Sequence, residues 1–299
     1  MKNLISADQL TRKTIEMLCE KADDIRANPS KYSKVLDGKV VATLFYEPST
    51  RTRLSFESAI LRLGGQIIST ENASESSSDK KGESVEDTIR IVQGYADAIV
   101  MRHYDDDSAE AGNKVATVPI INAGAGKGEH PTQALLDIYT LRNCKGKIDG
   151  LSVCLLGDLK YGRTTHSLVK LLALYDDITI YALSDERLAL PQEYIDIMKK
   201  ANVKFVKAKS FADLPHDIDA FYQTRVQLER IDGDVSNRTD VDLTSEIMKS
   251  FSDDSIILHP LPRNAEISMD LDEDKRAVFF EQAKNGLYAR MALLCEVLA

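Results

Sequence analysis

The chain has 299 residues, of which 43% are hydrophobic, and its formal net charge is -9 at pH 7. This length is enough for two domains of ordinary size, and the hydrophobic fraction excludes a chain that is disordered throughout. No apolar run approaches the roughly 20 residues that cross a membrane, and the segment Met1–Asp8 lacks the apolar stretch of a signal peptide. We therefore expect a cytoplasmic protein with no membrane partner.

The charge and the metal-ligating residue types exclude further classes. Nucleic acid is not an expected partner, because nucleic-acid binders carry a basic surplus or stripe and this chain has neither. An acidic surface with locally positive clefts suits a small anionic ligand. The five histidines are scattered without an HExxH spacing, so no metal site is expected. Cys19, Cys144, Cys154 and Cys295 form no CxxC pair, and we expect buried thiols in a reducing cytosol.

The chain begins with a helix signal and continues as alternating strands and helices. Ser6-Ala7-Asp8-Gln9 resembles a capping box, and the spacing of Leu10, Ile15, Leu18 and Ile25 predicts the helix that follows. Short, apolar, β-branched runs then alternate with helical patterns, which is typical of parallel sheets covered on both faces. The predicted strands are 40–45, 66–69, 98–101, 118–121, 152–157, 178–183, 203–206, 219–222 and 256–258. The predicted helices after the first are 53–63, 85–95, 131–142, 164–175, 191–201, 243–250 and 286–298.

The distribution of these elements predicts an α/β protein of two domains, each a mostly parallel sheet flanked by helices. The segment Asn143–Lys147 separates two halves of similar size. We assign residues 1–131 and 286–299 to the first domain and residues 132–285 to the second, with the C-terminal helix after Asn285-Gly286 returning to the first domain. Segments 71–84 and 226–242 are predicted to be mobile, functional loops.

Cations and hydrogen-bond donors follow one predicted strand after another. Ligands of open α/β sheets bind beyond the carboxyl ends of the strands, so these positions indicate a binding site. The segments in question are Ser49–Arg53, Arg102, His130–Gln133, Lys160–Thr164, Arg225–Gln227 and His259–Arg263. In the first, three hydroxyls and two arginines lie at the start of a helix, where free N–H groups favour an anion.

Each of these segments also has a structural alternative. Ser49 or Thr50 can be an ordinary N-cap, and Pro131 can simply occupy the first position of a helix. Arg102 can be a surface arginine, and Arg225 can pair with Glu229 on one helical face. Their coincidence at strand ends favours a binding site over these separate explanations.

Three other segments are ambiguous. Lys80-Lys81, after the serine run Ser74–Ser78, is either a solvated charge run or a loop that delivers a lysine to an anion. Gly157–Thr164 has the spacing of a Walker A loop, but Arg163 stands where lysine belongs, which disfavours a nucleotide triphosphatase. Gly124–Gly128 fits neither the Walker nor the dinucleotide spacing and is predicted to be a flexible turn.

Taken together, these segments resemble the aspartate/ornithine carbamoyltransferase family. The matching stretches are Phe45–Arg53, Lys80–Glu83, Val100–His103, His130–Gln133, Gly157–Thr164, Thr224–Gln227 and His259–Arg263, and they span nearly the whole chain. The resemblance implies a transferase of pyrimidine biosynthesis that joins carbamoyl phosphate to the α-amine of L-aspartate, giving N-carbamoyl-L-aspartate and phosphate. The first domain would bind carbamoyl phosphate and the second L-aspartate. It also implies a homotrimer with shared active sites, and it leaves open whether separate regulatory chains bind and whether the holoenzyme is allosteric.

The resemblance further implies roles for the residues of the first substrate. The phosphate group would be held by Ser49, Thr50, Arg51 and Thr52. Thr52, Arg102 and His130 would polarise the carbamoyl carbonyl and stabilise the oxyanion that forms when the amine attacks. Gln133 and the backbone of Pro260 and Leu261 would hold the carbamoyl nitrogen. No covalent nucleophile and no cofactor are needed, since the amine attacks directly.

The roles implied for the second substrate involve arginine above all. Arg163, Arg225 and Gln227 would hold the two carboxylates of aspartate, a task suited to the planar guanidinium, and Leu261 would contact the same substrate. Ser77 and Lys81 would arrive from the adjacent chain. Lys81 would take part in aspartate binding and, with Arg51, in catalysis.

The sequence also bears on three alternatives to the aspartate enzyme. The ornithine branch carries a cysteine in its His-Cys-Leu-Pro motif, whereas this chain has His259-Pro260-Leu261-Pro262. Arg225 and Gln227 also suit a carboxylate better than an ammonium group. A catalytically inactive scaffold would lack one of Arg51, Lys81, Arg102 and His130, and all four are present. A P-loop nucleotide binder is the third alternative.

Overall fold

The computed structural model describes residues 1–71, 82–126, 128–225 and 241–299, and it separates into two compact units. Unit 1 comprises Met1–Leu136 together with Lys284–Ala299, and unit 2 comprises Asp137–Ala283. The first boundary therefore falls inside a helix, a few residues after the domain boundary predicted at residue 131. Within the described residues, no helix is both long and apolar enough to cross a lipid bilayer.

Unit 1 is built on a four-stranded parallel sheet in the order β2-β1-β3-β4. Its strands are β1 (Val40–Phe45), β2 (Gln66–Glu71), β3 (Ala98–His103) and β4 (Ile120–Ala125). Its helices are η1 (Ala7–Gln9), α1 (Arg12–Ala27), α2 (Pro29–Tyr32), α3 (Thr50–Arg62), α5 (Val85–Val92), α6 (Ser108–Val115), the start of α7 (Pro131–Lys145) and most of α11 (Phe279–Leu298).

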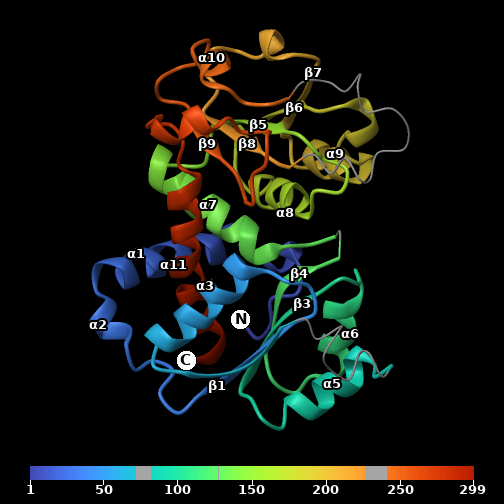
Figure 1. Ribbon diagram of the computed structural model, residues 1–299, viewed down its shortest axis with the longest axis vertical. Helices are drawn as coiled ribbons and strands as arrows, with labels where there is room; N and C mark the ends of the chain where they lie inside the picture. The colour runs from blue at the N-terminus through green and yellow to red at the C-terminus, as the bar shows by residue number, and fades with distance from the viewer. Residues whose placement is uncertain (72–81, 127, 226–240) are drawn as a thin grey trace. The chain divides into compact units, whose positions relative to one another are not determined.

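Side chains that alternate along β1 pack on opposite faces of this sheet. Ala42 and Leu44 join Ile89 of α5 and Ala109 of α6 in one apolar cluster. On the other face, the Thr43 hydroxyl donates a hydrogen bond of 3.0 Å to Glu57 of α3. Figure 1 shows α5 and α6 side by side on one face and α3 on the other. The sheet is thus covered on both faces, as a parallel sheet requires.

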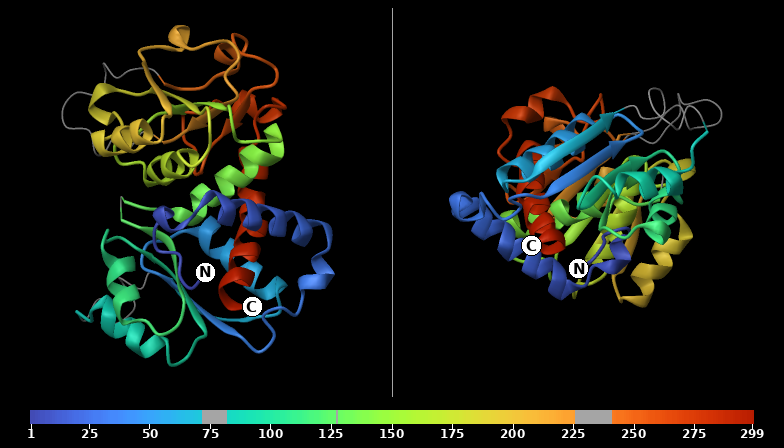
Figure 2. Two further views of the ribbon diagram at one scale, coloured as in Figure 1. Left: turned by 180° about the vertical axis from the view of Figure 1, so that it is seen from behind. Right: turned by 90° about the horizontal axis from the view of Figure 1, so that it is seen from below.

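Unit 2 is built on a five-stranded parallel sheet in the order β7-β6-β5-β8-β9. Its strands are β5 (Ser152–Leu156), β6 (Thr179–Leu183), β7 (Lys204–Ala208), β8 (Ala220–Gln223) and β9 (Ile256–Leu258). Its helices include α8 (Arg163–Leu172), η3 (Glu186–Leu188), α9 (Gln192–Lys200), η4 (Phe211–Asp213), α10 (Ser245–Met248) and η6 (Met269–Glu273). In unit 2, α7 and α8 lie on one face of the sheet and α10 on the other (Figures 1 and 2).

The two-domain α/β architecture with parallel sheets and helices on both faces is confirmed, and so are the nine predicted strands. The capping box at Ser6 is also present, but it caps the short 3-10 helix η1, and α1 begins one turn later behind the N-cap Thr11. Two short helices, α2 and α6, were not predicted. The turn predicted over 124–128 was wrong at its start, because β4 continues to Ala125.

The predicted start of the last helix was wrong as well. Asn285-Gly286 lies inside α11, which begins at Phe279. A Cβ at position 286 would lie 3.0 Å from Leu136 of α7 and 2.7 Å from the guanidinium of Arg290. Glycine therefore serves here for a close approach of two helices, a use that its helix-breaking tendency conceals in the sequence.

One cysteine also departs from expectation. Cys19, Cys154 and Cys295 are buried, but Cys144, in the last turn of α7, is exposed. Burial raises the pKa of the Cys154 thiol and raises that of Cys295 to about 11. These two thiols are accordingly kept protonated and unreactive.

We predict that Gly157→Ala destabilises unit 2 by about 2–4 kcal/mol, because it adds overpacking to left-handed backbone strain. Gly157 has φ +100°, and an added Cβ would overlap the carbonyl oxygen of Thr224. The matched control is Gly146→Ala, since Gly146 has φ +77° but nothing within 4 Å of the added Cβ. Thermal and urea unfolding would measure both, and equal destabilisation would show that the overlap with Thr224 does not matter.

Candidate active site

The candidate site residues of unit 1 follow three adjacent strands. β1, β3 and β4 are neighbours in the sheet and run parallel, so their carboxyl ends lie at one edge. Phe45, the last residue of β1, is paired with Arg102. The start of α3 follows β1, and the start of α7 follows β4. The fold of unit 1 thus gathers Ser49–Thr52, Arg102 and His130–Gln133 at the same edge of its sheet.

The start of α3 has the features of an anion site. Ser49 occupies the N-cap position, but its side chain makes no capping hydrogen bond. The first intrahelical bond runs from the N–H of Arg53 to the carbonyl of Ser49, at 3.0 Å. The N–H groups of Thr50, Arg51 and Thr52 therefore belong to the first turn, which lacks acceptors within the helix. With no acidic residue in that turn, this end of the helix is suited to bind an anion.

The two arginines of this turn differ in their surroundings. Arg53 is ion-paired with Glu57 at 2.9 Å and with Glu71 of β2, which secures it to its own unit. Arg51 is exposed and has no ion pair with any described residue. Thr52, by contrast, is buried. Arg51 is accordingly the guanidinium that this turn offers to a ligand.

Arg102 lies near the end of β3, with a side chain that is only 15% exposed. Its guanidinium is 3.4 Å from a carboxylate oxygen of Glu47, and its carbonyl accepts a hydrogen bond from the N–H of Tyr46. These contacts fix Arg102 beside the segment that leads into α3. The prediction that β3 ended at residue 101 was wrong by two residues, and Arg102 is therefore part of the sheet.

His130 and Gln133 lie where α7 begins, and both side chains are buried. The carbonyl of His130 accepts hydrogen bonds from the N–H groups of Gln133 and Ala134, so this residue does start the helix, with Pro131 in the first position. Its imidazole Nδ1 is 3.5 Å from the Thr132 hydroxyl. The helix-start interpretation is thus correct, and it coexists with a buried imidazole at the sheet edge.

In unit 2 the corresponding edge is formed by β5, β8 and β9, which are also adjacent and parallel. Arg163 is the first residue of α8, after the loop that follows β5, and Arg225 comes two residues after β8. The hydroxyl of Thr224 donates 2.8 Å to the carbonyl of Leu156, which fastens the end of β8 to β5. His259–Pro262 follows β9 directly.

The loop after β5 does not have the geometry of a phosphate-binding loop. The buried carboxyl of Asp158 accepts hydrogen bonds from the N–H groups of Lys160 at 3.1 Å and Tyr161 at 2.9 Å. In a Walker A loop such N–H groups bind the nucleotide phosphates. Here an internal carboxylate occupies them, which argues against the nucleotide-binding alternative.

The segment after β9 is held by its own side chains. The Nε2 atom of His259 is 2.9 Å from Glu266, and its Nδ1 accepts 2.8 Å from the N–H of Leu261. Both His259 and Glu266 are buried. Leu261 has φ +57°, a left-handed conformation that costs of order 1–3 kcal/mol for a residue other than glycine. Burial alone would raise the pKa of Glu266, but hydrogen bonds from His259 and Asn264 outweigh it and hold that pKa below its usual value.

A buried carboxyl in α7 connects two of the strand ends in unit 2. Asp137 accepts 2.7 Å from the hydroxyl of Tyr222 in β8 and 2.7 Å from the amide of Gln282 in α11. Gln282 in turn accepts 2.8 Å from the N–H of His259. Burial, and then the charge of Asp137, raise the pKa of Tyr222 well above its ordinary value, so its hydroxyl stays protonated as a donor.

Three of the predicted site residues fall outside the described part of the chain. Ser77, Lys81 and Gln227 lie outside the described residues, as do most of the segments 71–84 and 226–242. No group of histidine, cysteine, aspartate and glutamate side chains suited to a metal ion is found in the described ranges. Sequence reasoning missed Glu266, Asp137, Tyr222 and Gln282. Glu266 had a weak signal, an acidic residue a few positions after a Pro-rich turn, and the others had none.

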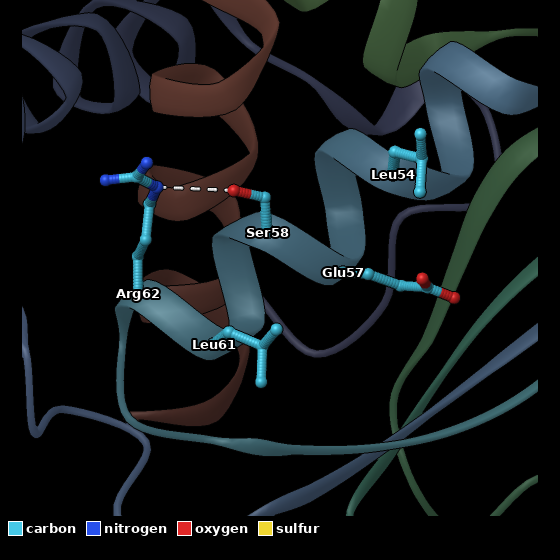
Figure 3. Close-up of a pocket in the computed structure, with 5 residues that line it drawn as sticks. All are labelled: Leu54, Glu57, Ser58, Leu61 and Arg62. Atoms are coloured by element: carbon cyan, nitrogen blue, oxygen red, sulfur yellow. Dashed lines mark hydrogen bonds between the residues drawn. The ribbon is translucent and has the colours of Figure 1, made fainter.

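A shallow depression lies on the outer face of α3, away from its first turn. It is lined by Leu54, Glu57, Ser58, Leu61 and Arg62, as Figure 3 shows. The guanidinium of Arg62 donates 3.2 Å to the Ser58 hydroxyl. Leu54 and Leu61 are 56% and 61% exposed, so this face presents apolar surface to its surroundings.

Two family models match the chain in sequence. Residues 2–143 match the carbamoyl-P binding domain of aspartate/ornithine carbamoyltransferases, and residues 149–297 match the Asp/Orn binding domain of the same proteins. The aspartate carbamoyltransferase catalytic subunit of Clostridium novyi is 45% identical over 300 residues, which covers 99% of this chain and 98% of that protein.

Solved structures of aspartate transcarbamoylases are similar to this chain along its whole length. The catalytic subunit of aspartate transcarbamoylase from M. jannaschii superposes with a TM-score of 0.91 at 43% identity, covering 99% of this chain and 98% of that chain. Aspartate transcarbamoylase from Trypanosoma cruzi, in complex with carbamoyl phosphate and aspartate, superposes with a TM-score of 0.93 at 37% identity. That match covers 100% of this chain and 97% of the other.

The start of α3 predicts phosphate binding that depends on Arg51. We expect inorganic phosphate to bind the wild-type protein and Arg51→Ala to weaken it about 10- to 100-fold, the usual effect of one charged hydrogen-bond donor. Isothermal titration calorimetry measures both. The control is Arg90→Ala, since Arg90 lies on α5 and pairs with Asp87, three residues earlier. An Arg51→Ala protein with unchanged phosphate affinity would contradict the assignment.

Proposed function

Because the chain belongs to the aspartate/ornithine carbamoyltransferase family and transfers the carbamoyl group of carbamoyl phosphate to the α-amine of L-aspartate, we propose that residues at its two sheet edges bind these substrates. The products are N-carbamoyl-L-aspartate and phosphate. The observation that carries the proposal is the gathering of donors at the carboxyl ends of adjacent parallel strands in each unit. A role in pyrimidine biosynthesis follows from the reaction, and a cytoplasmic location is part of the same proposal.

Carbamoyl phosphate binds at the edge of unit 1 in this proposal. Its phosphate group accepts hydrogen bonds from the N–H groups at the start of α3, from the hydroxyls of Ser49, Thr50 and Thr52, and from the guanidinium of Arg51. Two observations support this placement of the phosphate group. The side chain of Ser49 makes no capping hydrogen bond, and Arg51 has no ion pair with any described residue. The carbamoyl nitrogen donates to Gln133 and to the carbonyls of Pro260 and Leu261.

In this proposal three donors promote attack at the carbonyl carbon. Thr52, Arg102 and His130 donate to the carbonyl oxygen, which becomes an oxyanion when the amine attacks. Donors fixed in advance stabilise such developing charge strongly, because they need no rearrangement during the reaction. The tetrahedral intermediate then expels phosphate, whose oxygens are suited to accept the proton of the amine. Orientation and charge stabilisation thus account for catalysis without a covalent bond between enzyme and substrate.

L-Aspartate binds at the edge of unit 2, with Leu261 beside it. Arg163 and Arg225 grip its carboxylates, and we propose Gln227 and Lys81 as further ligands although they lie outside the described residues. The fastening of Thr224 to Leu156 supports this assignment, because it fixes the residue before Arg225 to the strand that leads toward Arg163. Two guanidinium groups favour a dicarboxylic amine over ornithine, whose side chain is cationic.

We also propose a homotrimer in which Ser77 and Lys81 complete the site of a neighbouring chain. The exposed leucines on the outer face of α3 support an association of copies, since contiguous apolar surface on a helix is suited to burial against a partner (Figure 3). The same helix carries Arg51 at its start. Separate regulatory chains have no support among these observations.

The substrate is tested by offering aspartate or ornithine with carbamoyl phosphate and measuring the ureido product by colour. We expect product with aspartate and background with ornithine. Arg225→Ala should raise KM for aspartate at least about 100-fold with little change in KM for carbamoyl phosphate. Lys249→Ala is the control, because Lys249 is the exposed C-cap residue of α10 and pairs with Glu246. Efficient use of ornithine by the wild-type chain would overturn the choice of substrate.

Sharing of sites is tested by mixing two inactive variants, Arg51→Ala and Lys81→Ala. If each site takes Arg51 from one chain and Lys81 from the next, subunits that reassort at random restore about a quarter of the sites. The activity of the mixture after gentle dissociation and reassociation measures this fraction. A mixture kept without dissociation is the control and should stay inactive. A reassorted mixture without activity would mean that every chain builds its own site.

A further inference from the structure

The segment from His259 to Glu266 is organised around one buried carboxyl. Glu266 accepts 2.9 Å from His259 and 3.0 Å from the N–H of Asn264, with the same oxygen atom. Because the Nδ1 atom of His259 accepts the N–H of Leu261, the ring hydrogen must lie on Nε2 and point to Glu266. Glu266 therefore fixes both the tautomer and the orientation of the ring that holds Leu261.

From His259 to Pro262 the backbone has no N–H group left for a ligand. The N–H groups of His259, Leu261 and Asn264 are bound internally, to Gln282, His259 and Glu266 respectively. Pro260 and Pro262 have no N–H. No described residue donates a hydrogen bond to the carbonyls of Pro260 and Leu261, so both can accept one from a ligand.

We propose that Glu266 is a positioning residue of the transfer reaction, which through His259 aims the Pro260 and Leu261 carbonyls at the amino group of the carbamoyl donor. The inference rests on the proposed function and adds a residue outside its binding set. The segment would then select carbamoyl phosphate over an acyl phosphate of the same shape, because only carbamoyl phosphate carries N–H donors for these carbonyls.

Two further observations support this role. Leu261 has φ +57°, so its carbonyl direction depends on a conformation that the chain does not favour by itself and that the bond to His259 stabilises. The other end of the segment is held separately, since Gln282 accepts the N–H of His259 and donates to the buried Asp137. Glu266 therefore fixes the conformation of the residues that follow His259.

The experiment compares carbamoyl phosphate with acetyl phosphate, in which a methyl group replaces the amino group. The measured quantity is the ratio of the inhibition constant of acetyl phosphate to KM for carbamoyl phosphate. We expect Glu266→Met, which keeps the volume and removes the acceptor, to lower this ratio about tenfold, the scale of lost hydrogen bonds to one amino group. Glu266→Gln keeps an acceptor for both donors and should recover most of the ratio.

Ser255→Ala is the matched control. Ser255 is buried at the other end of β9, and its hydroxyl donates 2.6 Å to the carbonyl of Ile218. Its loss should lower stability without changing the ratio. A purely structural role of Glu266 predicts that Glu266→Met also leaves the ratio unchanged, which would overturn the proposal.

Failure of the proposed function can be told apart from failure of the positioning role. If the wild-type protein forms no ureido product, the proposed function fails whatever the variants do, whereas an active wild type with an unchanged ratio in Glu266→Met rejects the positioning role alone. Should Glu266→Met not fold, His259→Asn decides, because asparagine keeps an acceptor for the N–H of Leu261 but does not reach Glu266. A ratio equal to that of the wild type in this variant would likewise overturn the role of Glu266.

Discussion

Parallel pairing of strands is the constraint on which the rest of this structure depends. In a parallel sheet all carboxyl ends lie at one edge, so residues far apart in the chain meet there if their strands are neighbours. In unit 1 the order β2-β1-β3-β4 makes neighbours of the strand before Ser49, the strand that carries Arg102 and the strand before His130. In unit 2 the order β7-β6-β5-β8-β9 does the same for Arg163, Arg225 and His259. The gathering of these residues at each edge is thus a consequence of strand order.

Buried polar groups then give those edges a fixed shape. The carboxyls of Asp137, Asp158 and Glu266 are all buried, and each accepts at least two hydrogen bonds from the segments around the edge of unit 2. A buried carboxylate is costly unless its oxygens are satisfied, so each such group holds its partners firmly. Unit 1 relies instead on a helix start whose N–H groups remain available to a ligand.

The sequence predicts a large part of this structure, and the parts it leaves out have physical reasons. Apolar runs reveal strands such as β1, β3 and β5, because burial on both faces leaves a continuous pattern. The residues that we propose to bind the substrates are donors and cations at or after strand ends, so residue type and position suffice to propose them. Glu266 and Asp137 escape prediction because their partners are distant or are backbone groups, which no spacing in the sequence reveals. Gly286 escapes because its role depends on the neighbouring helix that carries Leu136.

The division of the chain into units also determines which unit is completed first during synthesis. Unit 1 takes its final segment from Lys284–Ala299, which includes buried residues such as Leu293 and Leu294. During synthesis this segment is made after every residue of unit 2, and chains are made at about 5–20 residues per second. The second unit therefore has all its residues while the first still lacks part of its interior. A nascent chain of this protein must hold its N-terminal half incomplete for at least several seconds, with apolar surface open to chaperones.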